Sequence, residues 1–300
     1  MEELLQQIFI GIVRGGVYAL IALGYTMVYG VLRLINFAHG DVYMMGAFFA
    51  YYTALKLGVK AATLPGQLTV MAAAMVGCAV LGVVIERLAY KPVRKAPRLT
   101  ALITAIGVSL LLENGGQIVF GPNTQPFPEI VPVRQVARLG SITVTNQQVL
   151  ILVSCLGLML LLQFFVHRTK MGKAMRAVSY DRDAASLMGI NTDSVISVTF
   201  AIGSALAGAA GVLLAIYDPT IDPLMGLLPG LKAFAAAVLG GIGSIPGAMF
   251  GGLFLGMAET LVAGSKLFSS YRDAIAFAVL VIVLLVKPTG IFGTGAVEKV

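Results

Sequence analysis

Several polar or charged side chains interrupt long apolar stretches of this 300-residue chain. They are Asn36, His39, Asp41, Glu113, Asn114, Lys232 and Glu259. Polar groups are costly inside a lipid bilayer, so those that occur there often line the path of a substrate or an ion. We predict that Asn36, His39 and Lys232 lie on such a translocation pathway or at its gates.

Each of these side chains also has a purely structural alternative. Asn36, His39 and Asp41 precede or open an apolar segment, where short polar groups favourably cap a helix. Glu113 would be satisfied at the membrane–water interface, and a lysine near the start of its segment, as Lys232 is, could extend its ammonium to that interface. Glu259 is the deepest of the group and could pair with a base on a neighbouring helix.

The arrangements that enzymes use are not found in this pattern. Cys78 and Cys155 lie within apolar stretches without a neighbouring His, and His39 and His167 are too far apart for zinc spacing. A GxxxxGK motif followed by Ser or Thr, the signature of an ATP-binding P-loop, does not occur. We expect no catalytic residue, no metal and no cofactor bound by this chain, and we interpret both cysteines as small core residues.

The elements that position these polar groups are predicted to be membrane helices. Hydrophobic residues make up 58% of the chain and charged residues 12%, and the mean hydropathy is +0.91. A soluble domain of this length could not bury so much apolar surface. The net charge of +7 comes from short loops between apolar runs, which argues against nucleic acid as a partner. We expect an all-α, polytopic integral membrane helical bundle forming one domain over residues 1–300.

The bundle should contain eight or nine hydrophobic segments. The apolar runs cover residues 8–31, 42–57, 64–85, 99–120, 149–166, 195–217, 230–242, 245–263 and 274–286. A helix needs about 20 residues to cross roughly 30 Å of hydrocarbon. Segment 230–242 is shorter than that and could be a re-entrant or broken helix, so whether it crosses fully stays open.

Two basic loops predict how the bundle is oriented. Residues 86–98 contain five Lys or Arg against one Glu, and residues 167–193 contain five against three Asp. Short loops rich in Lys and Arg remain in the cytoplasm. This rule places the N-terminus in the periplasm, the C-terminus in the cytoplasm, and residues 121–148 outside, with a short strand expected at 142–145.

Small residues recur on one helix face at four places in the second half of the chain. The pairs are Ser204 with Gly208, Ala207 with Gly211, Gly247 with Gly251, and Gly252 with Gly256. Such faces let two helices approach closely in lipid. The partner helix could belong to the same chain or to another subunit.

The cytoplasmic loop 167–193 contains an acid followed by two alanines, three further residues and a glycine. This sequence, from Asp183 to Gly189, resembles the EAA loop of bacterial ABC importer permeases, with Asp in place of the usual Glu. The resemblance implies a short coupling helix that docks into a cleft of an ATP-binding subunit. Two alanines make a narrow helix face, and glycine can end the helix at positive φ. The expected coupling residues are Arg176, Arg182, Asp183, Ala184, Ala185 and Gly189.

Longer ordered matches extend the resemblance over almost the whole chain. Residues 15–47, 85–94, 171–193 and 232–252 are similar to the LivH and BraD family of permeases from high-affinity branched-chain amino acid importers. The resemblance implies a subunit in the bacterial inner membrane that moves Leu, Ile and Val into the cytoplasm by ATP-driven alternating access. Segment 121–148 departs most from the family, and no role is transferred to it.

The family resemblance also implies several partners. These are a second, related permease, two ATP-binding subunits that use the ATP, a periplasmic amino-acid-binding protein and the lipid bilayer. By position in a predicted outer loop, Asp218 and Asp222 would meet the binding protein. The alternative is an ion-coupled secondary amino acid transporter, which would need a titratable acid at mid-membrane, such as Glu113 or Glu259.

Overall fold

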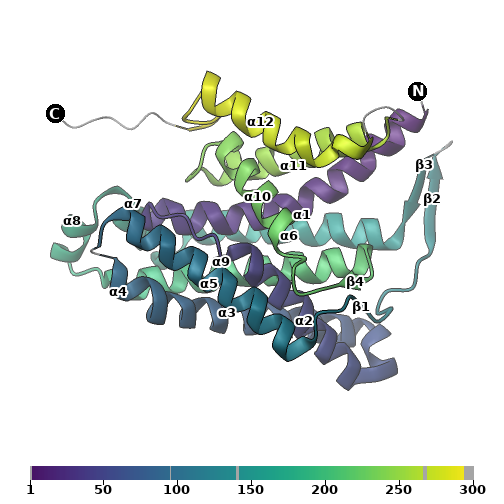
Figure 1. Cartoon of the computed structure of the whole chain (residues 1–300), viewed down its shortest axis with the longest axis horizontal. Helices are drawn as coiled ribbons and strands as arrows, with labels where there is room; N and C mark the ends of the chain where they lie inside the picture. The colour runs from purple at the N-terminus through teal and green to yellow at the C-terminus, as the bar shows by residue number, and fades with distance from the viewer. Residues whose placement is uncertain (1, 95, 140–141, 266–268, 294–300) are drawn as a thin grey trace.

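The computed structural model describes residues 2–94, 96–139, 142–265 and 269–293, and helices dominate it (Figure 1). Seven helical segments in this described part are long and apolar enough to cross a membrane. They contain α1 (Glu2–Leu32), α3 (Leu64–Ile85), α5 (Arg98–Phe120), α6 (Asn146–Arg168), α9 (Thr192–Tyr217), α11 (Ile245–Ala263) and α12 (Arg272–Val286). The two remaining apolar segments form α2 (His39–Leu57) and the shorter α10 (Leu227–Gly240). The predicted all-α membrane bundle is confirmed.

The two ends of the bundle differ in structure. At one end, which we call the sheet end, β2 (Gln135–Leu139) and β3 (Ile142–Thr145) pair antiparallel, and β1 (Gln125–Pro126) pairs with β4 (Thr220–Ile221). The expected strand at 142–145 is therefore present. At the opposite end, the loop end, lie α7 (Lys170–Tyr180) and α8 (Arg182–Leu187) (Figure 1). The first and the second half of the chain both contribute segments to each end.

The first helix begins at the sheet end. The Gln6 side-chain amide accepts a hydrogen bond from the Thr143 backbone nitrogen at 2.9 Å, and it donates one to the Thr143 carbonyl at 3.4 Å. Helix α11 runs antiparallel to α1, because Gly256 packs on Gly15 while Gly264, after the end of α11, lies beside Gln7. The start of α1 and the end of α11 therefore share the sheet end.

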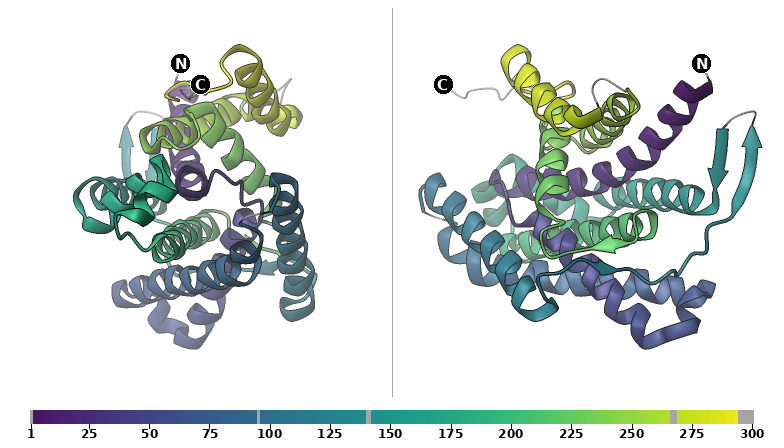
Figure 2. Two further views of the ribbon diagram at one scale, coloured as in Figure 1. Left: turned by 90° about the vertical axis from the view of Figure 1, so that its left-hand side faces the viewer. Right: turned by 45° about the vertical axis from the view of Figure 1, so that its right-hand side comes forward.

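Helix α10 does not cross the bundle like its neighbours. It stands across the direction of α1 (Figure 2, right), and its 14 residues extend only about 21 Å. The turn that follows it lies near Gly30, close to the end of α1. The chain thus passes from β4 to the loop end in two parts, an irregular segment and then the oblique helix α10. This arrangement matches the broken helix that was one option for segment 230–242.

Helices α1 and α9 form the centre of the bundle. In the most apolar 18-residue stretch of each span, 72% of the residues are buried for α1 and 78% for α9. The same share is 17% for α5 and 6% for the span that contains α12. The outer faces of α5 and α12 are therefore left for lipid or for another subunit. Cys78 and Cys155 are buried and free, in agreement with the interpretation of both as core residues.

The small-residue faces pack inside this chain. A Cβ atom added to Gly252 would overlap Ala19, and one added to Gly256 would overlap Gly15. The other faces approach neighbouring helices in the same way: Ser204 meets Gly82, Gly208 meets Cys78, Gly211 meets Tyr43, and Gly251 meets Ala236. These faces let α9 pack closely on α2 and α3, and α11 on α1 and α10, so each face already has a partner within the chain.

Candidate functional site

The predicted coupling element is a pair of short helices at the loop end. Thr169 caps α7 by accepting a hydrogen bond from the Gly172 backbone at 3.0 Å. Asp181 caps α8 by accepting from the backbone nitrogens of Asp183 and Ala184 at 3.0 and 2.9 Å. Gly189 follows α8 with a φ of +82°, a conformation that glycine adopts without strain. The short helix and its glycine stop are as expected.

The exposed face of α8 differs from the predicted one. Ala185 is buried, whereas Ala184 and Asp183 are exposed, as is Arg176 on α7, and Arg182 is half-buried. At the end of α8, the large apolar side chains of Leu187 and Met188 are 89% and 83% exposed. The two groups lie next to each other in an otherwise polar loop. Sequence reasoning missed them, although two large apolar residues directly before Gly189 were the available signal.

Hydrogen bonds and ion pairs join the coupling element to the bundle. The Ser179 hydroxyl of α7 donates to the Gly30 carbonyl of α1 at 2.5 Å. Asp193, in the first turn of α9, accepts from Arg94 at 2.7 Å and pairs with Lys91 at 2.8 Å. Burial lowers the pKa of the Arg94 guanidinium, and the neighbouring Asp193 carboxylate opposes that shift. The Ser179 bond thus ties α7 to α1, and the Asp193 ion pairs tie the start of α9 to the segment that follows α3.

Arg94 also belongs to a buried cluster beneath the loop end. Its guanidinium pairs with Glu86, whose side chain is fully buried. The second oxygen of Glu86 accepts from the Ser197 hydroxyl of α9 at 2.6 Å. The cluster links the end of α3 to α9.

Lys232 lies inside a polar cluster between four helices. Its ammonium is 2.8 Å from Glu259 of α11 and 2.6 Å from Asp273 of α12, and the Tyr18 hydroxyl of α1 donates to Glu259 at 2.8 Å. Lys232 is buried, so the idea that it extends to the interface is wrong. The expected base beside Glu259 is present. The pathway role of Lys232 stays a prediction, and its ammonium is already held by two carboxylates.

Asn36 and His39 are buried near the start of α2. The Asn36 side-chain oxygen accepts from the Tyr90 hydroxyl at 2.7 Å. The His39 ring packs edge-on against Tyr25 at 4.8 Å, and its Nε2 has no hydrogen-bond partner among the described residues. Their pathway roles stay predictions. No side chain caps α2, whose N-cap is Ala38, whereas Asp41 does lie in the first turn of α2, where an acid is favourable.

A pocket of about 400 Å³ opens between α2, α5 and α10. We call it the inner pocket. Its wall is mostly apolar, from Leu102, Ile106 and Leu110 of α5 and Leu227 and Leu231 of α10. Its polar side chains are Asp41, Ser109, Glu113 and Tyr25 of α1, and the Ser109 hydroxyl donates to Asp41 at 2.5 Å. The structure thus brings Asp41 and Glu113 together, and it separates them from Lys232, whose partners are Glu259 and Asp273.

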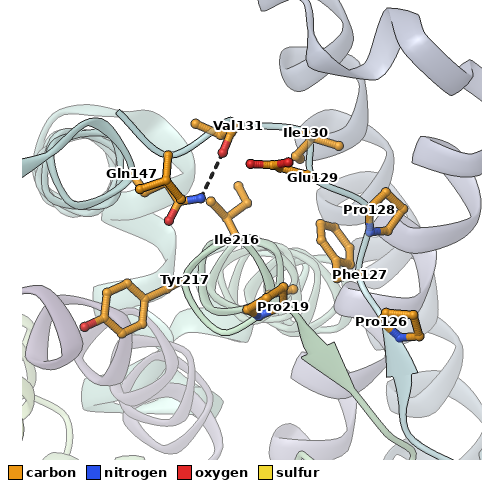
Figure 3. Close-up of a pocket in the computed structure, with 12 residues that line it drawn as sticks. Pro126, Phe127, Pro128, Glu129, Ile130, Val131, Gln147, Ile216, Tyr217 and Pro219 are labelled. Carbon is orange, nitrogen blue, oxygen red and sulfur yellow. Dashed lines mark hydrogen bonds between the residues drawn. The ribbon is translucent and has the colours of Figure 1, made fainter. Parts of the chain in front are cut away.

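A second pocket, of about 370 Å³, lies at the sheet end (Figure 3). Segment 126–131 forms one wall, and Gln147, Ile216, Tyr217 and Pro219 complete it. The Gln147 amide donates to the Val131 carbonyl at 2.8 Å and holds that segment in place. Asp218 and Asp222 lie beside this outer pocket in the chain, where they accept turn hydrogen bonds from Thr220 and Leu224. Their docking role stays a prediction.

These features together fit a multi-span membrane transport permease. They are the spanning helices, the short helix pair with an exposed apolar tip at one end, and the polar clusters and pocket within the bundle. The chain belongs to the family described as "Branched-chain amino acid transport system / permease component", whose model matches residues 7–284. It is therefore a permease of the branched-chain amino acid ABC transporter family.

Two relatives match nearly the full length of the chain. The chain is 46% identical to the high-affinity branched-chain amino acid transport system permease protein LivH of Escherichia coli (strain K12), over 99% of this chain and 97% of that protein. It is 44% identical to the corresponding protein BraD of Pseudomonas aeruginosa, over 99% and 98% of the two chains. Both relatives are named as permease proteins of transport systems. A permease of an ABC transporter works together with other subunits.

Proposed function

We propose that this chain moves Leu, Ile and Val into the cytoplasm as a membrane subunit of an ATP-driven importer. The observation that carries this proposal is the exposed Leu187–Met188 tip of α8, held at the loop end on a helix with the predicted EAA-like pattern. The names of the relatives support the choice of substrates. The ATP itself would be bound and hydrolysed by partner subunits.

The proposed assembly assigns a partner to each end of the bundle. Two ATP-binding subunits would cover the loop ends of this chain and of a related second permease in a bacterial inner membrane. A periplasmic amino-acid-binding protein would dock at the sheet end, near Asp218 and Asp222. This orientation puts the N-terminus in the periplasm and the C-terminus in the cytoplasm. The C-terminal residue itself lies outside the described residues.

The links around α8 suggest how ATP would drive the permease. Closure of the ATP-binding subunits would move α8 together with α7 and α9, which it contacts, and the Ser179–Gly30 bond would pass the motion of α7 to α1. Helices α1 and α9 form the centre of the bundle, so their movement would rock the packed halves from one open side to the other. Hydrolysis would reset the arrangement.

The test is leucine uptake by the complete complex in proteoliposomes, with substitutions at the tip of α8. Leu187→Glu places a charge on the exposed tip and should abolish both uptake and leucine-stimulated ATP hydrolysis. Ala184→Asp and Gly189→Arg should have the same effect. Val59→Glu is the matched control, because Val59 is 93% exposed but lies in the turn after α2. Undiminished uptake by a correctly inserted Leu187→Glu protein would contradict the proposal.

A further inference from the structure

The inner pocket has the size and lining of a small-molecule site. Its volume of about 400 Å³ falls within the roughly 300–1,000 Å³ of ligand pockets in proteins. Leucine and isoleucine supply five of its thirteen lining residues, so the transfer of an aliphatic side chain from water into the pocket would be favourable. A few polar groups are confined to one side. Such an arrangement suits a ligand with an apolar body and a polar head.

The polar side of the inner pocket carries two acids without a base beside them. Asp41 is 2% exposed and Glu113 is 9% exposed, and their carboxyl groups are close enough to interact. No Lys, Arg or His is among the described residues that line the pocket. The ion pairs found in the described part of the chain involve other acids. A buried carboxylate without a counter-ion is costly, and a ligand ammonium would stabilise the ionised form of these acids.

The backbone at the inner pocket offers the opposite polarity. The first turns of α2 and α10 meet there: a Cβ atom on Gly40 would lie 2.6 Å from the Gly226 carbonyl and 3.0 Å from Gly230 Cα. Neither helix has a side-chain cap at its N-terminus. The His39 and Leu227 backbone N–H groups already donate to the Asn36 and Leu224 carbonyls, so the two helix starts favour a carboxylate through the positive end of the helix dipole.

We infer that the inner pocket binds the amino acid within the membrane as a zwitterion. Asp41 and Glu113 hold the α-ammonium, the starts of α2 and α10 face the α-carboxylate, and the α5 and α10 side chains pack on the aliphatic group. This inference rests on the proposed function and adds a substrate site to it. Glu259 is a weaker candidate for the same role, since Lys232 and Tyr18 already satisfy its carboxylate.

The inference can be tested by direct binding, without ATP and without the periplasmic protein. The purified complex in nanodiscs is titrated with leucine, with leucinol, which lacks the carboxylate, and with 4-methylpentanoate, which lacks the ammonium. Both analogues should bind the wild type far more weakly than leucine. Asp41→Asn and Glu113→Gln should each weaken leucine binding by about thirtyfold or more. Glu129→Gln, which changes an exposed acid of the outer pocket (Figure 3), should bind leucine normally.

A second pair of variants does not depend on the acids. Ile106→Trp fills the inner pocket and should block leucine binding, whereas Ile103→Trp changes an exposed neighbour on α5 that does not line the pocket and should leave it intact. Equal leucine binding by Ile106→Trp, Asp41→Asn and the wild type would overturn the inference. If ATP-driven uptake nevertheless proceeds normally in these variants, the proposed function stands and only the substrate site is wrong. Leucine binding without ATP-driven uptake in the wild type would instead reject the proposed function.

Discussion

The Lys232 ammonium lies 2.8 Å from the Glu259 carboxylate, and both side chains are buried between α1, α10, α11 and α12. Asp273 completes the cluster at 2.6 Å from the same ammonium. Because α10 is short and oblique, it cannot be held in place by a full crossing of the bilayer. The ion pair therefore attaches α10 to the helices on either side of it, and it keeps the α10 wall of the inner pocket in position.

Removal of the lysine alone should strongly destabilise the protein. In Lys232→Met, Glu259 stays buried without a counter-ion, which should lower the free energy of unfolding by about 3–5 kcal/mol. The double variant Lys232→Met/Glu259→Gln removes both charges and should recover a large part of that loss. Denaturant titration in detergent micelles measures both values. Equal destabilisation by the single and double variants would show that the pair does not act as a unit.

Close packing of α1 on α11 predicts opposite effects for two Gly→Ala substitutions. A Cβ atom on Gly15 would lie 2.7 Å from Leu253 Cα and 2.9 Å from the Gly252 carbonyl, whereas one on Gly157 of α6 would meet nothing within 4 Å. Gly15→Ala should lower stability by about 1–3 kcal/mol. Gly157→Ala should raise it by up to about 1 kcal/mol, because alanine favours the helix. Thermal unfolding of the two variants gives the comparison, and equal shifts in Tm would refute the packing argument.

The loop-end cluster contains one buried ion pair and one partly exposed ion pair, and the two should differ in their contribution to stability. Arg94→Met leaves the fully buried Glu86 without its guanidinium, so we expect a loss of about 3–5 kcal/mol in unfolding free energy. Asp193→Asn removes a carboxylate that is 47% exposed, and exposed pairs contribute at most about 1 kcal/mol. The same titration distinguishes them. A larger loss for Asp193→Asn than for Arg94→Met would contradict this assignment of burial.

The sheet end should bind its periplasmic partner partly through charge. In Asp218→Asn/Asp222→Asn, the amide oxygen can still accept the turn hydrogen bond from Leu224, so the loop should keep its shape. The association rate of the amino-acid-binding protein should fall severalfold at low salt, and the difference should shrink as salt screens the charges. Surface plasmon resonance at two ionic strengths measures this. An unchanged rate at low salt would remove these two residues from the docking surface.

The local features of the fold follow from sequence patterns. The apolar runs become helices, Gly189 ends α8, and the strand at 142–145 forms, because hydrophobic length, glycine conformation and alternating residues act over short stretches of chain. The same reasoning identified Glu259 as a residue that needs a base. It could not say that the base is Lys232, since a contact between residues on different helices depends on how those helices pack.

The inner pocket shows why the candidate site was harder to predict. Asp41 and Ser109 are far apart in the chain and meet only because α2 packs on α5. Short-range reasoning could therefore offer only separate alternatives for them, helix capping for Asp41 and the membrane interface or a mid-membrane position for Glu113. Leu187 and Met188 were missed for another reason: an apolar residue is normally expected to be buried, and only the structure shows that α8 leaves both exposed.

The most direct test of the account is leucine accumulation in proteoliposomes that contain the wild-type complex and its binding protein, with ATP inside and no gradient of H⁺ or Na⁺. We predict accumulation that requires ATP hydrolysis and persists when ionophores dissipate every ion gradient. Accumulation without ATP, driven by an imposed ion gradient and abolished by ionophores, would contradict it. That result would show the chain to be an ion-coupled carrier.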